Sequence, residues 1–281
     1  MLSSPITPFI FKQNFYHIKR DDLLKPFEGN KARKFYYFLK RDFPEIKRVI
    51  SFGSNQSNAM YSLSKLCKIK GWEFIYYTNH IPSFLKQNPH GNYFEALKNG
   101  IKIVESDLRG DKLREFVLGL KDKNTLIIEE GGRIKESEEG IKILADEINE
   151  YCIKHNLKVF LPSGTGTTAY FLSKHLDVEV ITVPCVGDSE YLKKQWSFLG
   201  GGKIPAIVEP KRKYYFGKLY KNLYDVWLEL KNAGIEFDLL YDAIGWETLL
   251  YHNLQNILYI HQGGVLGNIS MVKRYKRKFG Y

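Results

Sequence analysis

The chain has 281 residues, 44% of them hydrophobic, and its 42 basic residues against 31 acidic ones give a formal net charge of +11. No stretch reaches the roughly 20 uninterrupted apolar residues of a membrane helix, and the N-terminus lacks a signal-like apolar block, so we expect a cytoplasmic protein without a membrane partner. Interleaved acidic residues argue against nucleic acid binding, and three scattered cysteines argue against disulfides or a metal site.

The first informative segment is KRDDLLKPFEGNKARK, which begins at Lys19. Gly29 and Asn30 both tolerate left-handed backbone angles, so they can form a tight turn that aims Lys31 inward before a helix-like run. A partly desolvated lysine has a lowered pKa, and its neutral amine can form a Schiff base with an aldehyde, usually pyridoxal 5'-phosphate (PLP). The alternative is that Lys31 is an ordinary surface lysine that opens a basic helix.

The middle of the chain alternates short apolar runs with amphipathic stretches, which predicts strand and helix units around a parallel sheet. The predicted strands cover residues 48–53, 73–79, 101–106, 125–132, 158–164, 179–187, 237–242 and 257–264. The predicted helices cover residues 57–70, 90–99, 137–155, 167–175, 189–199, 221–233 and 268–278. Most of these strands end in Gly, Ser, Asn or Asp, as expected at a ligand-facing edge.

The segment SFGSNQSN, which begins at Ser51, also runs from a strand end into a helix. Ser57 is expected at or near the helix N-cap, and capping alone would explain a serine there.

The segment LPSGTGTT, residues 161–168, exposes backbone N–H groups at a helix N-terminus, which favours a phosphate. Gly164, Gly166 and Ala169 also satisfy the dinucleotide pattern G-x-G-x-x-A, with Asp188 and Glu190 where a ribose would need a carboxylate. A nicotinamide-dependent (NAD-type) dehydrogenase is therefore an alternative. The hydroxyl groups favour a phosphate monoester, and they belong to Ser163, Thr165, Thr167 and Thr168.

These segments, in this order, resemble the 1-aminocyclopropane-1-carboxylate deaminase and D-cysteine desulfhydrase family of fold type II PLP enzymes. The other landmarks are EEGG at 129–132, FG at 216–217, LLYD at 239–242 and IHQGG at 260–264. The resemblance implies two open α/β domains with mainly parallel sheets, and PLP in the cleft between them. It also implies a large domain of residues 1–40 and 131–281, a small domain of residues 41–130, and a homodimer.

The resemblance also implies a role for each matching residue. Lys31 would bind PLP covalently and move protons on the substrate, and Asn58 would bond the phenolic oxygen of the cofactor. Tyr241 would face the substrate as a catalytic acid, base or helper of the nucleophile, and Asp242 would keep the pyridine nitrogen protonated. The phosphate would be held by Gly164, Thr165, Gly166, Thr167 and Thr168. The substrate carboxylate would be bound by Ser57 with Asn55 or Gln56, and Ser57 is also a candidate for the ring-opening step.

Two positions depart from the deaminase pattern. Gln262 replaces an expected leucine and would place a polar amide facing the cofactor. Phe216 replaces an expected tyrosine, whose phenol Tyr214, Tyr215 or Tyr220 could supply. We therefore expect a deaminase or lyase that releases ammonia and a 2-oxo acid from a small amino acid, and a PLP-binding protein without turnover stays as a further alternative.

Overall fold

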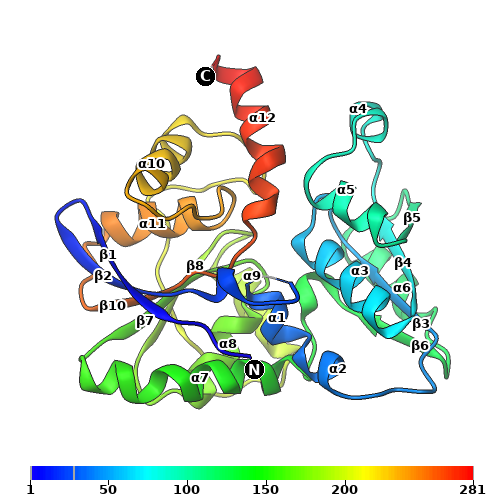
Figure 1. Ribbon diagram of the computed structural model, residues 1–281, viewed down its shortest axis with the longest axis horizontal. Coiled ribbons are helices and arrows are strands. Elements are labelled where there is room, and N and C mark those ends of the chain that lie inside the picture. The colour runs from blue at the N-terminus through cyan, green and yellow to red at the C-terminus, as the bar shows by residue number, and fades with distance from the viewer. Residues whose placement is uncertain (1, 28, 281) are drawn as a thin grey trace.

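The computed structural model describes residues 2–27 and 29–280 of the chain, and Figure 1 shows two α/β bodies side by side. One body is built on a four-stranded parallel sheet with the strand order β5-β4-β3-β6. Its strands are β3 (Arg48–Phe52), β4 (Glu73–Thr78), β5 (Lys102–Glu105) and β6 (Thr125–Ile128). Its helices are α3 (Asn58–Lys70), α4 (Ser83–Gln87), α5 (Gly91–Lys98) and α6 (Gly110–Leu118).

The other body is built on a six-stranded sheet with the order β1-β2-β10-β7-β8-β9, in which only the β1–β2 pair is antiparallel. Its strands are β1 (Ile6–Phe11), β2 (Asn14–Lys19), β7 (Lys158–Ser163), β8 (Val180–Pro184), β9 (Ala206–Ile207) and β10 (Ile257–Ile260). Its helices are α7 (Ser137–Lys154), α8 (Thr167–His175), α9 (Ser189–Ser197), α10 (Lys221–Asn232), α11 (Asp242–Tyr251) and α12 (Asn268–Phe279). The central strands are buried on both faces, which is why β8 and β10 are almost continuously apolar.

Three short helices connect the two bodies: η1 (Asp21–Leu23), α1 (Asn30–Lys34) and α2 (Tyr36–Lys40). Helix α1 lies centrally in Figure 1 and packs against α7. A Cβ on Gly140 of α7 would overlap the carbonyl oxygen of Arg33, so a glycine is needed for the two helices to approach this closely. Two further 3-10 helices, η2 (Glu130–Gly132) and η3 (Val265–Gly267), follow β6 and β10.

The structure confirms all seven helices and seven of the eight strands predicted from the pattern. The strand predicted over residues 237–242 is wrong, because this segment turns into α11. The Asp238 carboxylate accepts the backbone N–H groups of Leu240 and Tyr241, and Asp242 accepts the N–H of Asp238. Such side-chain bonds compete with a strand ladder.

The six-stranded sheet draws its strands from residues 6–19 and 158–260, and the four-stranded sheet draws them from residues 48–128. The domain boundaries at residues 40/41 and 130/131 stay a prediction. Across the described residues, no helix combines the length and the apolar character needed to cross a bilayer.

Candidate functional site

The turn before Lys31 is shaped by a close backbone contact. Gly29 has φ 70°, and a Cβ on it would overlap the carbonyl oxygen of Gln262. The N–H of Asn30 donates to that same carbonyl oxygen at 2.9 Å, while the N–H of Gly29 donates to the carbonyl of Asp21 at 2.8 Å. A glycine is therefore required at position 29, and the turn sets the direction in which α1 starts.

Lys31 is 8% exposed, and its Nζ donates to Asn30 Oδ1 at 2.8 Å. Burial lowers the pKa of Lys31 from 10.5 to about 8, although the negative charge of Asp238 opposes this shift. About one amine in ten is then neutral at pH 7, compared with fewer than one in a thousand for an ordinary lysine. The site therefore holds a nucleophilic amine near neutral pH.

Gln262 is bonded to protein groups at both ends of its amide. Its Oε1 accepts from Asn30 Nδ2 at 2.9 Å, and its Nε2 donates to the carbonyl of Pro162 at 2.6 Å. This amide therefore bridges the turn before α1 to the end of β7, and the expectation that it faces a cofactor stays a prediction. The amides of Gln262 and Asn30 thus form a continuous set of bonds that ends at the amine of Lys31.

The loop after β7 has the features of a phosphate site. Gly166 has φ 68° and precedes the first residue of α8, and the hydroxyls of Thr165 and Thr167 lie 3.0 Å apart. The Thr168 Oγ1 atom is buried and has no hydrogen-bond partner among the described residues. An unpaired buried hydroxyl beside a helix N-terminus suits an anionic ligand.

The start of α3 carries Ser57 and Asn58. Ser57 is the N-cap, and its Oγ accepts from the N–H groups of Ala59 at 3.1 Å and Met60 at 3.4 Å. Asn58 Oδ1 is buried and unpaired among the described residues, and a Cβ on Gly264 would lie 3.7 Å from Asn58 Nδ2. The structure thus brings the start of α3 against the loop after β10.

Asn55 and Gln56 are tied to a neighbouring segment. Asn55 Nδ2 donates to the carbonyl of His80 at 3.3 Å, and Gln56 Nε2 donates to the carbonyl of His90 at 3.4 Å. Gln56 Oε1 accepts from the N–H of Tyr93 at 3.4 Å. In this structure both amides therefore hold the segments around α4 and α5 in place, whereas the Ser57 side chain interacts with Tyr76 of β4.

Tyr241 and Asp242 lie at the start of α11. A Cβ on Gly164 would lie 3.2 Å from the Tyr241 ring. Tyr241 therefore contacts the loop between β7 and α8, residues 164–166, which we call the phosphate-type loop. Burial and then the charge of Asp238 raise the pKa of Tyr241 well above 10, which keeps the phenol protonated. Asp242 is 1% exposed and accepts from Tyr259 OH at 2.8 Å. Its pKa is raised well above 3.8 by burial and by Asp238.

The three tyrosines considered as replacements for the phenol at position 216 differ in their surroundings. The Tyr214 hydroxyl donates to Glu247, and the Tyr220 hydroxyl accepts from the N–H of Tyr215 at 3.0 Å. Tyr215 is 60% exposed. The ring of Phe216 packs against Tyr241 with centroids 5.3 Å apart. Position 216 therefore supplies an apolar wall beside the Tyr241 phenol.

The sequence analysis missed three charged residues in this region: Lys34, Glu130 and Asp238. Lys34 lies one turn after Lys31, is 3% exposed and donates to the carbonyl of Gly131 at 3.0 Å. Burial and the charge of Lys31 lower its pKa well below 10.5. The i, i+3 spacing of the two lysines was a signal that could have found Lys34, since residues so spaced share a helix face.

The carboxylates expected for a dinucleotide site have other partners. Asp188 Oδ1 caps α9 by accepting the N–H of Tyr191 at 3.0 Å. Glu190 forms an exposed ion pair with Lys193 at 2.7 Å. Both acidic residues are therefore explained by local structure.

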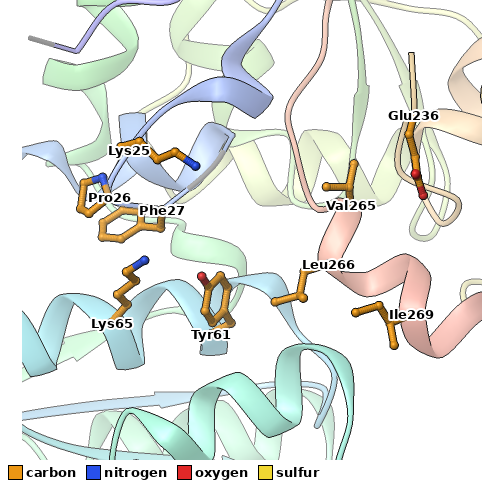
Figure 2. A pocket seen from close by; sticks show the side chains of 9 residues that line it. All are labelled: Lys25, Pro26, Phe27, Tyr61, Lys65, Glu236, Val265, Leu266 and Ile269. Atoms are coloured by element: carbon orange, nitrogen blue, oxygen red, sulfur yellow. The ribbon is translucent and has the colours of Figure 1, made fainter. Parts of the chain in front are cut away.

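A cavity of about 460 Å³ lies beside α3 and η3 (Figure 2). It is lined by Lys25, Pro26, Phe27, Tyr61, Lys65, Glu236, Val265, Leu266 and Ile269. None of the predicted site residues lines it, so it is a separate feature next to the site. No cluster of three or more His, Cys, Asp or Glu side chains suited to a metal occurs within residues 2–27 and 29–280.

Three solved structures show which fold this is. An ACC (1-aminocyclopropane-1-carboxylate) deaminase homologue superposes with a TM-score of 0.80 at 21% identity, covering 97% of this chain and 92% of its own. A hydrogen sulfide-producing enzyme from Fusobacterium nucleatum gives a TM-score of 0.66 at 14% identity, with coverages of 92% and 93%. A pyridoxal 5'-phosphate-dependent aspartate racemase gives 0.63 at 14% identity, with coverages of 93% and 90%.

These likenesses confirm the predicted fold class, an α/β fold of type II with mainly parallel sheets. No protein-family model matches the sequence, and no curated protein matches it either.

Proposed function

We propose that this protein is a PLP-dependent enzyme that binds its cofactor through Lys31 and acts on a small amino acid as a deaminase or lyase. The observation that carries the proposal is the buried amine of Lys31, whose pKa is lowered to about 8. A buried lysine amine with a lowered pKa and a loop suited to an anion are the two features that an aldehyde carrying a phosphate needs.

The residues fit this cofactor on independent grounds. Thr168 Oγ1 and Asn58 Oδ1 are both buried without partners, at the starts of α8 and α3. The Thr168 hydroxyl would donate to the phosphate with Thr165, Thr167 and the N–H groups around Gly164 and Gly166. The Asn58 amide would bond the phenolic oxygen, and a cationic ring nitrogen beside Asp242 would offset the repulsion between Asp242 and Asp238.

Each of the remaining residues has a separate part in the proposed reaction. When bound, PLP withdraws electrons from the substrate carbon. Ser57 Oγ accepts two backbone N–H groups and also lies within hydrogen-bond reach of the Tyr76 phenol, so its hydroxyl would turn from Tyr76 to the substrate carboxylate. Lys31 moves a proton on the carbon skeleton, and the protonated phenol of Tyr241 can donate a proton. Water then supplies the oxygen of the 2-oxo group, and release of ammonia and the 2-oxo acid completes the turnover.

The test is covalent attachment of the cofactor. The purified protein should show a yellow absorbance band that borohydride removes, and the reduced protein should carry the cofactor mass on the peptide that contains Lys31. Lys31→Ala should lose this adduct completely, whereas Lys40→Ala in α2 should keep it. An adduct that survives in Lys31→Ala would refute the site.

A second measurement is needed to identify the substrate and to show that turnover occurs. Ammonia and 2-oxo acid release should be measured with 1-aminocyclopropane-1-carboxylate, D-cysteine and D-serine. A bound cofactor that no amino acid perturbs would instead support a PLP-binding protein without turnover. We also propose that the protein is a homodimer, which light scattering would test.

A further inference from the structure

Glu130 occupies a position between the two loops of the proposed site. It is the first residue of η2, where Gly131 has φ 69°. A Cβ on Gly131 would lie 3.0 Å from the Thr165 side chain, so this turn touches the phosphate-type loop. A Cβ on Gly53 would lie 3.0 Å from Glu130 Oε1, so the carboxylate touches the loop that leads to Ser57.

The carboxylate of Glu130 is reachable by water, although protein surrounds it on several sides. The residue is exposed, yet desolvation raises its pKa above 4.5. Burial raises the pKa of Tyr76 on β4, Tyr191 on α9 and Tyr241 at the N-cap of α11, and the charge of Glu130 adds to each shift. Side chains from both bodies thus lie near the Glu130 carboxylate.

Glu130 lacks a partner in this position. Within residues 2–27 and 29–280 its carboxylate makes no hydrogen bond or ion pair. The nearby cation, Arg133, is 7% exposed and is already bonded to Glu129 and Gln195, with its guanidinium 4.5 Å from the Phe198 ring centre. The Tyr76 hydroxyl donates to the carbonyl of Ser54 at 3.1 Å. A carboxylate so placed can accept a hydrogen bond from a bound molecule.

We propose that Glu130 is a specificity-determining residue that selects amino acids whose side chain carries an ammonium group. This inference rests on the proposed function, because it places the amino acid between Ser57 and the phosphate-type loop. An ammonium would pair with the free carboxylate, whereas an acidic side chain would be repelled by it. An aliphatic side chain would leave Glu130 unpaired and gain nothing from it.

The experiment measures dissociation constants of the PLP-loaded protein by calorimetry and by the change in cofactor absorbance. The probes are both enantiomers of 2,3-diaminopropionate, 2,4-diaminobutyrate, alanine and aspartate. The wild type should prefer a diamino acid, and Glu130→Gln should weaken that binding about tenfold to a hundredfold, as expected for a lost charge-assisted hydrogen bond. Binding of alanine should stay within about twofold, and binding of aspartate should improve.

Two further variants act as controls. Glu136→Gln removes an exposed carboxylate six positions further along the chain and should leave every constant unchanged. Glu130→Asp keeps the charge and should retain part of the preference for diamino acids. Melting temperatures within about 2 °C of the wild type would show that the variants are folded.

The outcomes separate this inference from the proposed function. If amino acids bind the wild type but Glu130→Gln weakens all probes equally, or none, the role of Glu130 is refuted and the proposed function stands. If the protein never attaches PLP, the proposed function fails and the inference fails with it.

Discussion

The backbone turn before Lys31 determines how deeply its amine is buried and therefore its pKa. Gly29 lets the chain pass against Gln262, and the side chains of Asn30 and Gln262 then hold the Lys31 amine in a buried position. Burial disfavours the charged amine more than Asp238 stabilises it, so the pKa of Lys31 is lowered to about 8. Burial, and then the positive charge of Lys31, also lower the pKa of Lys34, which lies next along the same helix face.

This lowered pKa predicts a measurable titration in the cofactor-free protein. Carbon NMR of protein with labelled lysine side chains should show one resonance that titrates near pH 8, while exposed lysines titrate near 10.5. The amine is protonated below this pH and neutral above it. Because the unfolded chain still binds the proton up to about pH 10.5, stability should rise with pH between about 8 and 10.5.

Lys31→Arg should remove this resonance, and a control such as Lys142→Arg in α7 should remove only one that titrates normally. A spectrum in which every lysine titrates near 10.5 would contradict the burial of Lys31.

The element that carries this lysine is too short to be stable by itself. Helix α1 spans five residues, so its position depends on tertiary contacts. Arg33 is fully buried and bonds Asp21 through Nε at 3.0 Å and Nη2 at 2.7 Å, while its Nη1 bonds Glu147 of α7 at 2.8 Å. Lys19 at the end of β2 bonds the same glutamate at 2.6 Å. These ion pairs attach α1 to the six-stranded sheet and to α7.

Removing one member of this network should be costly. We expect Asp21→Asn to lower the free energy of unfolding by about 3 to 5 kcal/mol, because the buried guanidinium of Arg33 then loses its bidentate partner. Asp146→Asn breaks the exposed pair with Lys142 and should cost less than about 1 kcal/mol. Urea denaturation of both variants checks this difference. Equal effects would mean that the buried network does not anchor α1.

At the scale of the whole molecule, the proposed site is assembled from both bodies. Asn58 begins α3 on the four-stranded body, and Thr167 begins α8 on the six-stranded body (Figure 1). The η2 turn after β6 packs against α3, and Gly131 of this turn is also close to Thr165 in the loop before α8. A ligand that binds all of these groups would connect the two bodies.

This arrangement predicts the pattern of hydrogen exchange. Adding PLP to the cofactor-free protein should slow exchange of backbone amides at the starts of both α3 and α8, with little change in α10 at the far side of the larger body. Lys31→Ala should show a weaker effect, because the cofactor would then be held without its covalent bond. Protection at only one of the two helix starts would contradict a shared site.

Much of the fold could be predicted from the sequence because its signals are local. Seven strands and seven helices follow from apolar periodicity, and the loops after β3 and β7 follow from where their strands end. The β1–β2 hairpin was missed because its turn residues are Lys12 and Gln13, with φ 47° and 65°, rather than the Asn-Gly pair that marks such turns. Helix α11 was missed because it is apolar on most sides and contains Gly245.

By itself, the sequence determined the order of the elements, the turn before Lys31, and the hydroxyl-rich loop at the start of α8, since these depend on neighbouring residues. Only the tertiary structure decided which charges meet. The charge of Asp238 stabilises protonated Lys31, and the Lys34 amine donates to the carbonyl of Gly131. The Glu130 carboxylate faces the loop before Ser57. These contacts join residues from about 75 to over 200 positions apart in the sequence. A local sequence pattern cannot predict them, because they form only when the two bodies pack together.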